Sequence, residues 1–360
     1  MMIVAMGGGT GLATLLQGLK KYVRSNGSGD GLVSLSGKAE AGEPWIQELN
    51  AIVAVSDDGG SSGRLRRAFQ VLPPGDIRNC LVALSEDEAL LSRLFQFRFP
   101  NGRGLKGHSF GNLFLTALTG VTGDFQDAVK VSGKVLATRG RIYPSTNSDV
   151  HLEADLEDGS VVRGETHVSR SRSPIHRIRL LPANCRPLPQ TLEALSNADV
   201  ITIGPGSLFT SLIPNLLVRG VAKQMAGSRA ARIYICNLMT QPGETTGYSA
   251  ADHVRAIYDH CGFPVFDYVI LNRKPVSPQI RKRYVAQRAQ PVEIDREALE
   301  QLGVKVVTGD LLSEQRQNPA DKKLVRHHSD RLAKMVIEIG AHHHSTARRQ
   351  KPAGRNQRHA

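Results

Sequence analysis

Short, unbroken apolar runs occur in the N-terminal part of the chain, and stretches with helical periodicity follow them. Residues 2–6 and 51–55 are continuous apolar runs, as found in parallel strands that are buried on both faces. A glycine turn at 7–11 leads into a predicted helix that ends near residue 22. The sequence Pro73–Pro74–Gly75–Asp76 is a start signal for another helix, on which Ile77, Cys80, Leu81 and Leu84 share one face.

Helical periodicity continues and then gives way to alternation in the middle of the chain. Further helices are predicted around residues 90–95, from about 109, and over 124–136. Residues 151–156 and 160–168 resemble two strands joined by a tight turn at Asp158–Gly159. They predict an antiparallel hairpin beside the main sheet, with a further strand at 175–181.

The strand–helix rhythm returns after residue 200 and sets the fold class. Strands are predicted at 200–203, 233–236, 265–271 and 304–307, with helices at 249–260 and 320–339. Strands that alternate with helices favour a mainly parallel sheet covered on both faces. We therefore expect an α/β protein with a three-layer, Rossmann-like, mainly parallel sheet, helices on both faces and an antiparallel hairpin extension.

Composition divides the chain into one domain, an insertion and a tail. Residues 25–43 are rich in Gly and Ser and predict a flexible insertion within a single domain that covers 1–340. Residues 341–360 carry five Lys or Arg from Arg348 onward and no acidic residue, which is typical of a disordered basic tail.

The net charge of +13 suits anionic ligands, and with only 5% aromatic residues a nucleic-acid reader is not favoured. Binding of nucleic acid by the tail is the alternative.

Cysteine spacing and hydropathy exclude several classes of protein. Cys80, Cys185, Cys236 and Cys261 show no Cys-x-x-Cys spacing, so neither a zinc site nor a disulfide framework is expected. His342–His344 adjoin the basic tail and do not predict a built metal site. The first apolar run is too short for a membrane span and lacks the features of a signal peptide. We expect a cytoplasmic protein without a membrane span.

The first glycine cluster joins the first strand to the first helix and predicts a phosphate site. Gly8, Gly9, Thr10 and Gly11 allow a close approach of backbone N–H groups to an anion at a helix N-terminus. Leu12 replaces the third glycine of a dinucleotide fingerprint, and no Gly-Lys-Ser/Thr follows as in a P-loop. A tight turn without a ligand is the alternative.

A second polar cluster follows the second strand. Asp57 and Asp58 could hold Mg²⁺ or a ribose hydroxyl, and Gly59 and Ser61 could cradle an anion. A polar loop with a capped helix explains one of these residues, but not the whole string.

Two further clusters lie at predicted helix starts. Asp76 and Asn79 either contact a ligand or, in the case of Asp76, cap a helix. His108 and Asn112 occur in a polar, glycine-containing segment, where His108 could bind a phosphate or transfer a proton. A lone histidine is more often structural, so His108 depends on its neighbours for this role.

The later strands end in similar polar segments. Gly204, Gly206 and Ser207 follow one buried strand, and Asn237 and Thr240 follow the next. In open parallel sheets, ligands bind beyond the carboxyl ends of the strands. The coincidence of several such loops predicts one site that holds a phosphate-bearing nucleotide.

The ordered series of these motifs resembles a known family. The segments GGGTGL, SDDGGSSGRLR, PPGDIRNCLVAL, GHSFGNL, GPGSLFTSLIPNLL and NLMTQPGET, between Met2 and about Ile339, are similar to the bacterial gluconeogenesis factors. These proteins are related to the 2-phospho-L-lactate transferases, and the resemblance therefore indicates a CofD-like protein. It implies a cytoplasmic regulator of cell shape and wall-precursor supply during gluconeogenic growth, with an enzyme of wall-precursor synthesis as partner.

The resemblance also implies a ligand and its contacts. The implied ligand is UDP-N-acetylglucosamine or a dinucleotide, with no required cofactor. Gly8, Thr10, Gly11, Asp57, Asp58, Gly206 and Ser207 would line its site. Tyr284 and Arg326 match positions that contact the nucleotide, where Tyr284 could stack on the base and Arg326 could pair with the diphosphate.

Three interpretations of the function stay open at this point. The first is a ligand-binding regulator that needs no metal. The second is a transferase in which Asp57 and Asp58 hold Mg²⁺ and the glycine loops hold a guanosine nucleotide. The third is a nicotinamide oxidoreductase, which the broken fingerprint at Leu12 disfavours. A homo-oligomer is compatible with each of them.

Overall fold

A parallel sheet forms the centre of the protein. The computed structural model describes residues 1–24, 46–86, 89–315 and 324–349. Within these residues, seven strands form one sheet in the order β10-β9-β8-β7-β1-β2-β3, and every neighbouring pair is parallel. The strands are β1 (Met2–Gly7), β2 (Glu48–Val53), β3 (Arg141–Pro144), β7 (Val200–Ile203), β8 (Ala231–Ile235), β9 (Tyr268–Asn272) and β10 (Lys305–Gly309).

The strand order reverses between β1 and β7. From β1 the chain moves outward through β2 to β3, and from β7 it moves the opposite way through β8 and β9 to β10. Because strand–helix–strand crossovers are right-handed, opposite directions of travel place the connecting helices on opposite faces. The β1/β7 pair, with Ala5 beside Thr202, is therefore the topological switch point of a doubly wound sheet.

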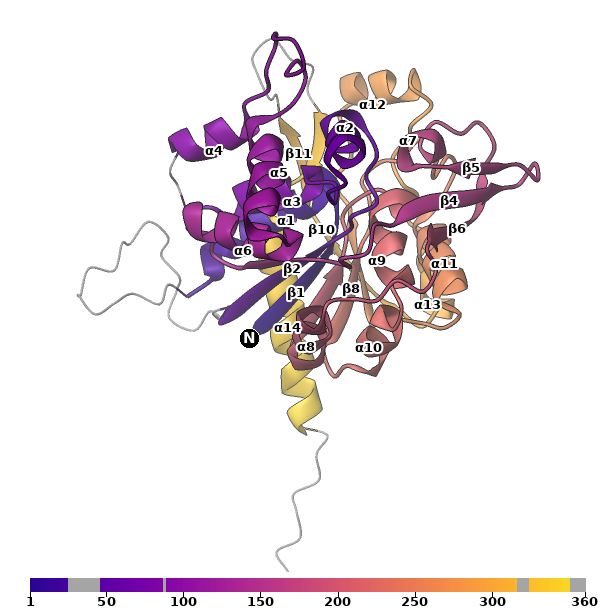
Figure 1. The fold of residues 1–360 in the computed structure, drawn as a ribbon. Coiled ribbons are helices and arrows are strands. Elements are labelled where there is room, and N and C mark those ends of the chain that lie inside the picture. Colours follow the sequence, from indigo (N-terminus) through magenta and orange to yellow (C-terminus); the bar gives the residue numbers. More distant parts are fainter. Residues whose placement is uncertain (25–45, 87–88, 316–323, 350–360) are drawn as a thin grey trace, which may run out of the picture.

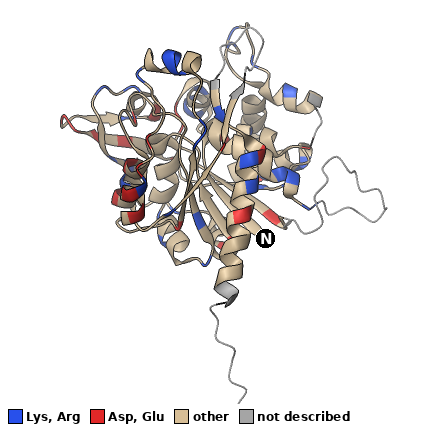
Figure 2. Ribbon diagram, turned by 180° about the vertical axis from the view of Figure 1, so that it is seen from behind, with Lys and Arg blue, Asp and Glu red and all other residues tan. Residues whose placement is uncertain are grey.

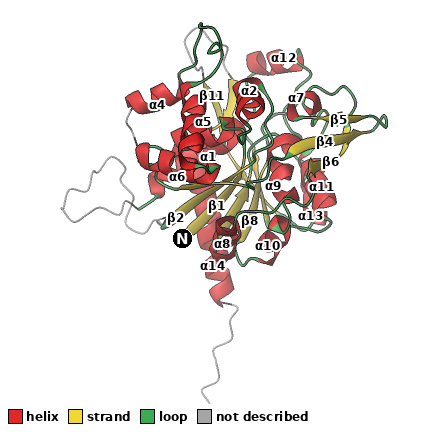
Figure 3. Cartoon of the chain, in the orientation of Figure 1, coloured by secondary structure: helices red, strands yellow, loops and turns green. Residues whose placement is uncertain are grey.

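Helices cover both faces of this sheet, as the sequence predicted (Figures 1 and 3). One layer contains α1 (Gly9–Leu19), α3 (Gly75–Leu84) and α14 (Ser329–Arg349), and α1 packs against the other two. The other contains α8 (Pro189–Asn197), α9 (Ile213–Leu217), α10 (Val221–Gly227), α11 (Ala250–Cys261) and α13 (Arg296–Gln301). The short helices η1 (Lys20–Tyr22) and η2 (Leu208–Leu212) extend α1 and precede α9.

Apolar periodicity accounts for the core. Ile3, Val4, Ala5 and Met6 of β1 have no exposed surface, because helices cover both sides of the strand. On α1 the buried residues Leu12, Leu15, Leu16 and Leu19 recur every three or four positions and form one face. The predicted face of α3, with Ile77, Cys80, Leu81 and Leu84, is buried in the same core.

Helices extend the structure beyond β2 and β3. They are α2 (Gly60–Phe69), α4 (Ala89–Gln96), α5 (Phe110–Thr122) and α6 (Phe125–Val135). The Ser109 hydroxyl accepts from Asn112 N and caps α5, and the Asp124 carboxylate accepts from Asp127 N and caps α6. Both predicted helix starts are thus confirmed.

An antiparallel sheet lies beside the main one, as predicted. It has the order β5-β4-β6 and consists of β4 (His151–Leu156), β5 (Val161–Arg163) and β6 (Ile175–Leu181). The second strand of the hairpin is shorter than predicted, because residues 165–168 form helix α7 (Glu165–Val168). Asp58 Oδ1 accepts from Thr166 N at 2.9 Å, so a distant carboxylate stabilises this helical turn.

The C-terminal part also differs from the prediction. The stretch predicted as the start of the last helix includes the strand β12 (Leu324–His327), which pairs antiparallel with β11 (Leu312–Gln315). The helix α14 begins at Ser329 and continues to Arg349, beyond the predicted end at Ile339. His343, predicted to adjoin a disordered tail, contacts Tyr268 of β9 instead. The predicted insertion and residues 350–360 lie outside the described residues.

The remaining differences are local. Strand β2 lies three residues N-terminal to the predicted run, and β3, α2, α8, α10, α12 (Pro278–Val285) and α13 were not predicted. No helix among the described residues is long and apolar enough to cross a membrane.

Candidate functional site

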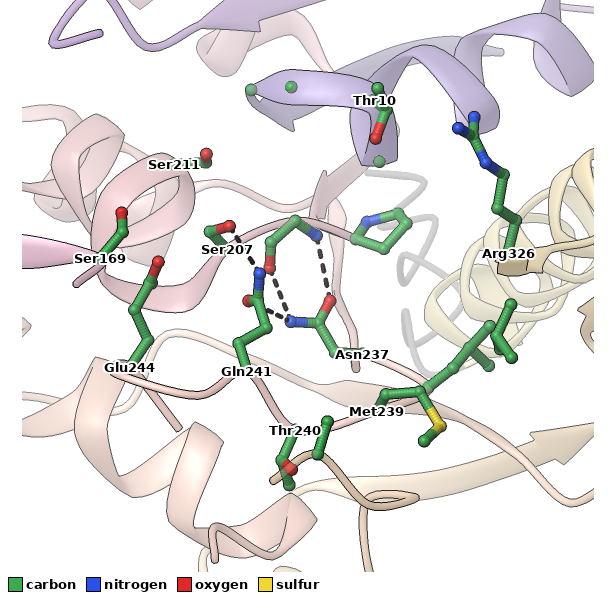
Figure 4. Close-up of a pocket in the computed structure, with 18 of the residues that line it drawn as sticks. Thr10, Ser169, Ser207, Ser211, Asn237, Met239, Thr240, Gln241, Glu244 and Arg326 are labelled. Carbon is green, nitrogen blue, oxygen red and sulfur yellow. Dashed lines mark hydrogen bonds between the residues drawn. The ribbon is translucent and has the colours of Figure 1, made fainter. Parts of the chain in front are cut away.

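A cleft of about 640 Å³ opens at the carboxyl edge of the sheet, beside the β1/β7 switch point (Figure 4). The loops after β1, β2, β7 and β8 and the start of α3 form one part of its wall, and α7, α12 and β12 form another part. Twelve of the residues singled out from the sequence line it: Gly8, Gly9, Thr10, Gly11, Asp57, Asp76, Gly206, Ser207, Asn237, Thr240, Tyr284 and Arg326. Clefts of this size commonly hold small ligands.

The two main glycine loops touch each other in this cleft. A Cβ atom built on Gly11 would lie 2.2 Å from the Pro205 carbonyl oxygen, and one built on Gly206 would lie 3.5 Å from the Gly8 carbonyl oxygen. A side chain larger than hydrogen at position 11 therefore cannot be accommodated without moving backbone. The loops predicted to converge do converge, on one rim of the sheet.

The start of α1 supplies donors to the cleft. The first turn of an α-helix leaves backbone N–H groups without intrahelical acceptors and carries the positive end of the helix dipole. The N–H of Gly9 donates to the carboxylate of Asp76. Thr10 and Gly11 also belong to this first turn, and both residues line the cleft. Their N–H groups are suited to an anionic ligand.

Side chains from the loop after β8 hold the loop after β7 in place. Asn237 Nδ2 donates to Gly206 O at 2.8 Å, and Gly206 N donates to Asn237 Oδ1 at 3.2 Å. Gln241 Nε2 donates to the Ser207 hydroxyl at 2.9 Å (dashed lines in Figure 4). Because Asn237 already accepts the Gly206 N–H, Asn237 orients the glycine loop as well as lining the cleft.

One end of the cleft is acidic. Burial and the nearby charge of Asp57 raise the pKa of Asp76 to about 6, although the Gly9 N–H opposes this shift. Burial, followed by the charges of Asp57, Asp76, Glu244 and Asp58, raises the pKa of Glu165 to about 9. Glu165 therefore carries a proton at neutral pH and can donate a hydrogen bond.

Glu244 completes the acidic end and anchors the helix that follows β7. Burial raises its pKa, while hydrogen bonds from Phe209 N and the Thr210 hydroxyl, each at 3.2 Å, oppose that shift. The carboxyl group thus satisfies two donors of η2 next to the glycine loop.

The opposite wall comes from α12 and β12. Val325 N donates to the Tyr284 hydroxyl at 3.1 Å, which ties the two elements together. Arg326 lines the cleft from β12, and it forms no ion pair with any described carboxylate. Burial lowers the pKa of His327 to about 4, so this ring is neutral, and its Nε2 has no hydrogen-bond partner among the described residues.

The other predicted site residues do not line the cleft. Ser61, His108 and Asn112 form an internal network, in which His108 Nδ1 lies 2.9 Å from Ser61 Oγ and Asn112 Nδ2 donates to Ser61 Oγ at 3.2 Å. Burial and the nearby charges of Arg64 and Arg98 lower the pKa of His108. These three residues connect α2 to the start of α5.

Four more predicted residues have structural contacts of their own. Asp58 accepts from Thr166 N and from its hydroxyl, and Asn79 accepts from Arg78 Nη2 at 2.6 Å. Gly59 is the N-cap residue of α2 and donates its N–H to Asp57 Oδ1. Gly204 has a φ of +89°, and a Cβ there would lie 2.6 Å from the Ile235 carbonyl oxygen. The turn after β7 therefore requires glycine at position 204.

The adjacent carboxylates Asp57 and Asp58 therefore do not act as a pair. Asp58 is directed to α7, while Asp57 lines the cleft with Asp76 and Glu165. No cluster of three or more His, Cys, Asp or Glu residues that could hold a metal ion occurs in the described part of the chain. Asp57 and Asp58, which would hold Mg²⁺ in the transferase alternative, are thus directed to different partners.

Several cleft residues were missed by the sequence reasoning. Ser211, Gln241 and Glu244 lie inside the polar segments after β7 and β8, where their hydrogen-bonding side chains are a usable signal. Glu165 belongs to α7, within the predicted strand 160–168, and Ser169 follows directly after it. His327 belongs to β12, within the predicted helix 320–339. No local signal marked these three.

A second hollow of about 450 Å³ adjoins the cleft. The two share Asn237 and Leu238, and the second is also lined by Arg273, Lys274 and Arg281. A ligand that extends beyond the main cleft toward β9 would therefore meet positive charge.

Comparison with known proteins places these features in a family. Residues 3–312 match the family described as 2-phospho-L-lactate transferase CofD. A putative gluconeogenesis factor from Nostoc sp. is 50% identical over 344 residues, which cover 95% of this chain and 69% of that protein. The gluconeogenesis factor of Bacillus subtilis is 41% identical over 337 residues, covering 94% and 97% of the two chains.

Solved structures agree with the sequence comparisons. A Bacillus halodurans protein, described as a member of the upf0052 family and determined at 2.60 Å resolution, superposes with a TM-score of 0.83. The two share 42% sequence identity, and the match covers 93% of this chain and 98% of the other. The similarity thus extends over nearly the whole length of both chains.

Proposed function

Since this chain belongs to the CofD family, with relatives called gluconeogenesis factors along nearly its whole length, we propose that it is a regulator that binds a nucleotide sugar. The proposed ligand is UDP-N-acetylglucosamine. In this proposal the protein works in the cytoplasm, reports wall-precursor status to an enzyme of wall-precursor synthesis, and supports cell shape during gluconeogenic growth. A dinucleotide is the second ligand that such a cleft would accommodate.

The contact between the Gly11 and Pro205 loops is the observation that carries this proposal. Thr10 and Gly11, from the first turn of α1, line the cleft together with Ser207 of the other loop. A diphosphate placed there would accept from first-turn N–H groups and gain from the helix dipole. Arg326, which has no described carboxylate partner, supplies the balancing charge from β12.

The two ends of the cleft suit the two ends of a nucleotide sugar. Tyr284 offers an aromatic ring on the β12 side, where a uracil base can stack. Glu165 and Glu244 with Ser169 offer carboxyl and hydroxyl groups at the other end, where sugar hydroxyls can donate and accept. Because Glu165 holds its proton at neutral pH, this end carries less negative charge than its composition suggests.

Calorimetric titration tests the proposal. The full chain is titrated with UDP-N-acetylglucosamine, UDP-glucose, GDP and NAD in separate experiments. The proposal expects binding of the UDP-sugars in a ratio of one per chain, with competition between them. Heat from GDP alone, or from none of the four ligands, would rule it out.

A transferase of the phospholactate type is the second candidate, and one observation favours it. Asp57 and Asp76 lie next to the glycine loop, where a cation or an attacking hydroxyl would be placed. Incubation with a deazaflavin precursor, Mg²⁺ and a guanosine-activated phospholactate would reveal turnover. The regulator proposal expects no product, with the same preparation binding UDP-N-acetylglucosamine.

A further inference from the structure

Helix α4 exposes an apolar stripe to solvent although its other face is firmly packed. Phe95 is 1% exposed, and its ring packs against Phe110 and Phe114 of α5 at centroid distances of 5.9 and 5.0 Å. On the outer side, Leu90 and Leu94 are 78% and 41% exposed. The helix is thus apolar on two sides, and only one of them is used in the core.

The segment after α4 continues this apolar character. Phe97 is 47% exposed and follows Leu90 and Leu94 at helical spacing, while Leu105 is 41% exposed. Backbone hydrogen bonds from Phe99 N to His108 O and from Gly107 N to Phe99 O close a small hairpin that carries Leu105 near its tip. We call Leu90, Leu94, Phe97 and Leu105 the apolar stripe.

Basic residues accompany the apolar stripe along the chain, and the acidic residues 86–88 precede it. Residues 89–109 contain Arg93, Arg98, Arg103 and Lys106 and no acidic residue (Figure 2). None of these four forms an ion pair with a described carboxylate. Arg64 of α2 lies against the same hairpin and donates to Lys106 O at 2.9 Å.

We infer that α4 and the hairpin after it form a docking surface for an anionic phospholipid membrane. Exposed Leu and Phe side chains flanked by Arg and Lys are the chemistry that enters the headgroup region of a bilayer. Neither the main cleft nor the adjoining hollow includes any of these residues. The side chains project from a helix and a hairpin tip, and a fluid lipid interface accommodates such projections without a preformed hollow.

Charge complementarity decides the kind of membrane. Because the surface carries four cationic side chains and no carboxylate within residues 89–109, a neutral bilayer would gain only the apolar contacts. We therefore expect strong dependence on anionic lipid and on salt concentration. The site is independent of the nucleotide cleft, so this inference stands whether or not UDP-N-acetylglucosamine binds.

Vesicle co-sedimentation tests the inference. The full chain is mixed with vesicles of phosphatidylcholine alone, or of phosphatidylcholine and phosphatidylglycerol in equal parts. We expect binding to the second kind only, reduced by high salt. The double variant Arg103→Ser/Lys106→Ser should bind about thirtyfold more weakly, because each charge near an anionic surface contributes to partition. The variant Leu94→Ser/Phe97→Ser should lose about tenfold or more.

Two controls distinguish the apolar stripe from the rest of the protein surface. Val121→Ser removes an exposed apolar side chain from the far end of α5, where Val121 is 81% exposed, and should leave vesicle binding unchanged. A chain that ends at residue 349 lacks the last basic residues and should also bind as before. Absence of binding to anionic vesicles would overturn the inference. Binding that survives the Leu94→Ser/Phe97→Ser change but disappears on truncation would overturn it as well.

Discussion

Gly11 lies directly against the carbonyl group of Pro205, so closely that a Cβ atom at position 11 would be 2.2 Å from the Pro205 oxygen. The two residues are far apart in the sequence and follow β1 and β7, which are neighbours at the switch point of the sheet. Their contact joins two glycine loops into one wall of the cleft.

Gly11→Ala should therefore disrupt both the fold and the cleft. The added methyl group meets backbone on a neighbouring loop, which a rotamer change cannot relieve, and we expect a loss of roughly 1–3 kcal/mol in the free energy of unfolding. The affinity for UDP-N-acetylglucosamine should fall at least tenfold. Denaturant unfolding and calorimetry measure the two effects.

Gly120→Ala is the matched control for that variant. Gly120 lies within α5, and a Cβ there meets no atom within 4 Å, so alanine should stabilise the helix by about 0.5–1 kcal/mol. Equal losses of unfolding free energy in both variants would show that the contact between Gly11 and Pro205 does not account for the effect.

Arg326→Ala should weaken ligand binding without a comparable loss of stability. Arg326 forms no ion pair with a described carboxylate, so little native structure depends on its charge. If it pairs with a diphosphate, its removal costs about 1.5–3 kcal/mol of binding, or roughly tenfold to a hundredfold in affinity. Lys223→Ala, at an exposed position of α10, should leave the affinity unchanged. An unaltered affinity in Arg326→Ala would remove the residue from the site.

Glu165→Gln should flatten the dependence of stability on pH. The folded protein holds the pKa of Glu165 near 9, whereas the ordinary value is 4.5. The folded state therefore keeps a proton that the unfolded chain releases, and the stability that results is present at low pH and is lost as the pH rises toward 9. Glutamine is neutral throughout, so the variant should gain roughly 1–2 kcal/mol over the wild type at the alkaline end.

Thermal unfolding between about pH 5 and pH 9 checks this expectation. Glu193→Gln, at an exposed position of α8, serves as the control and should follow the wild-type profile. A Glu165→Gln profile parallel to that of the wild type would show that this carboxyl group is ionised in the folded protein.

Asp58→Ala should act through α7 rather than through direct ligand contact. The Asp58 carboxylate accepts from Thr166 N and Oγ1, so its loss uncaps the helix that carries Glu165. We expect a decrease of about 1–2 kcal/mol in the free energy of unfolding. Thr166→Val, which keeps the backbone bond but removes the hydroxyl, should lose less. Equal stability of Asp58→Ala and the wild type would contradict the structural role.

The sequence was sufficient to predict the sheet, apart from its edge strand β3, and the position of the cleft. Strands β1 and β7 are continuous apolar runs, and the glycine clusters that follow them are local signals with a direct physical meaning. Since the carboxyl ends of parallel strands share one edge, the sequence alone predicts that these loops meet.

Long-range contacts determined what the sequence did not predict. Residues 160–168 have the alternation of a strand, but Asp58 caps part of them as α7 and so brings Glu165 to the cleft. Asp58 and Ser61 belong to one polar segment, which predicts a single site. The start of α2 at Gly60 instead turns Ser61 toward His108, while Asp57 faces the cleft. The local sequence pattern does not show that the side chains of neighbouring residues are directed to different sites.

Hydrogen–deuterium exchange tests the central claim, that the two glycine loops hold one ligand together. Amide exchange is followed in peptides that cover residues 8–12 and 205–211, with and without UDP-N-acetylglucosamine. We predict that the ligand slows exchange in both segments, and that Arg326→Ala reduces the protection of both. Protection of one segment alone, or of neither, would contradict the account.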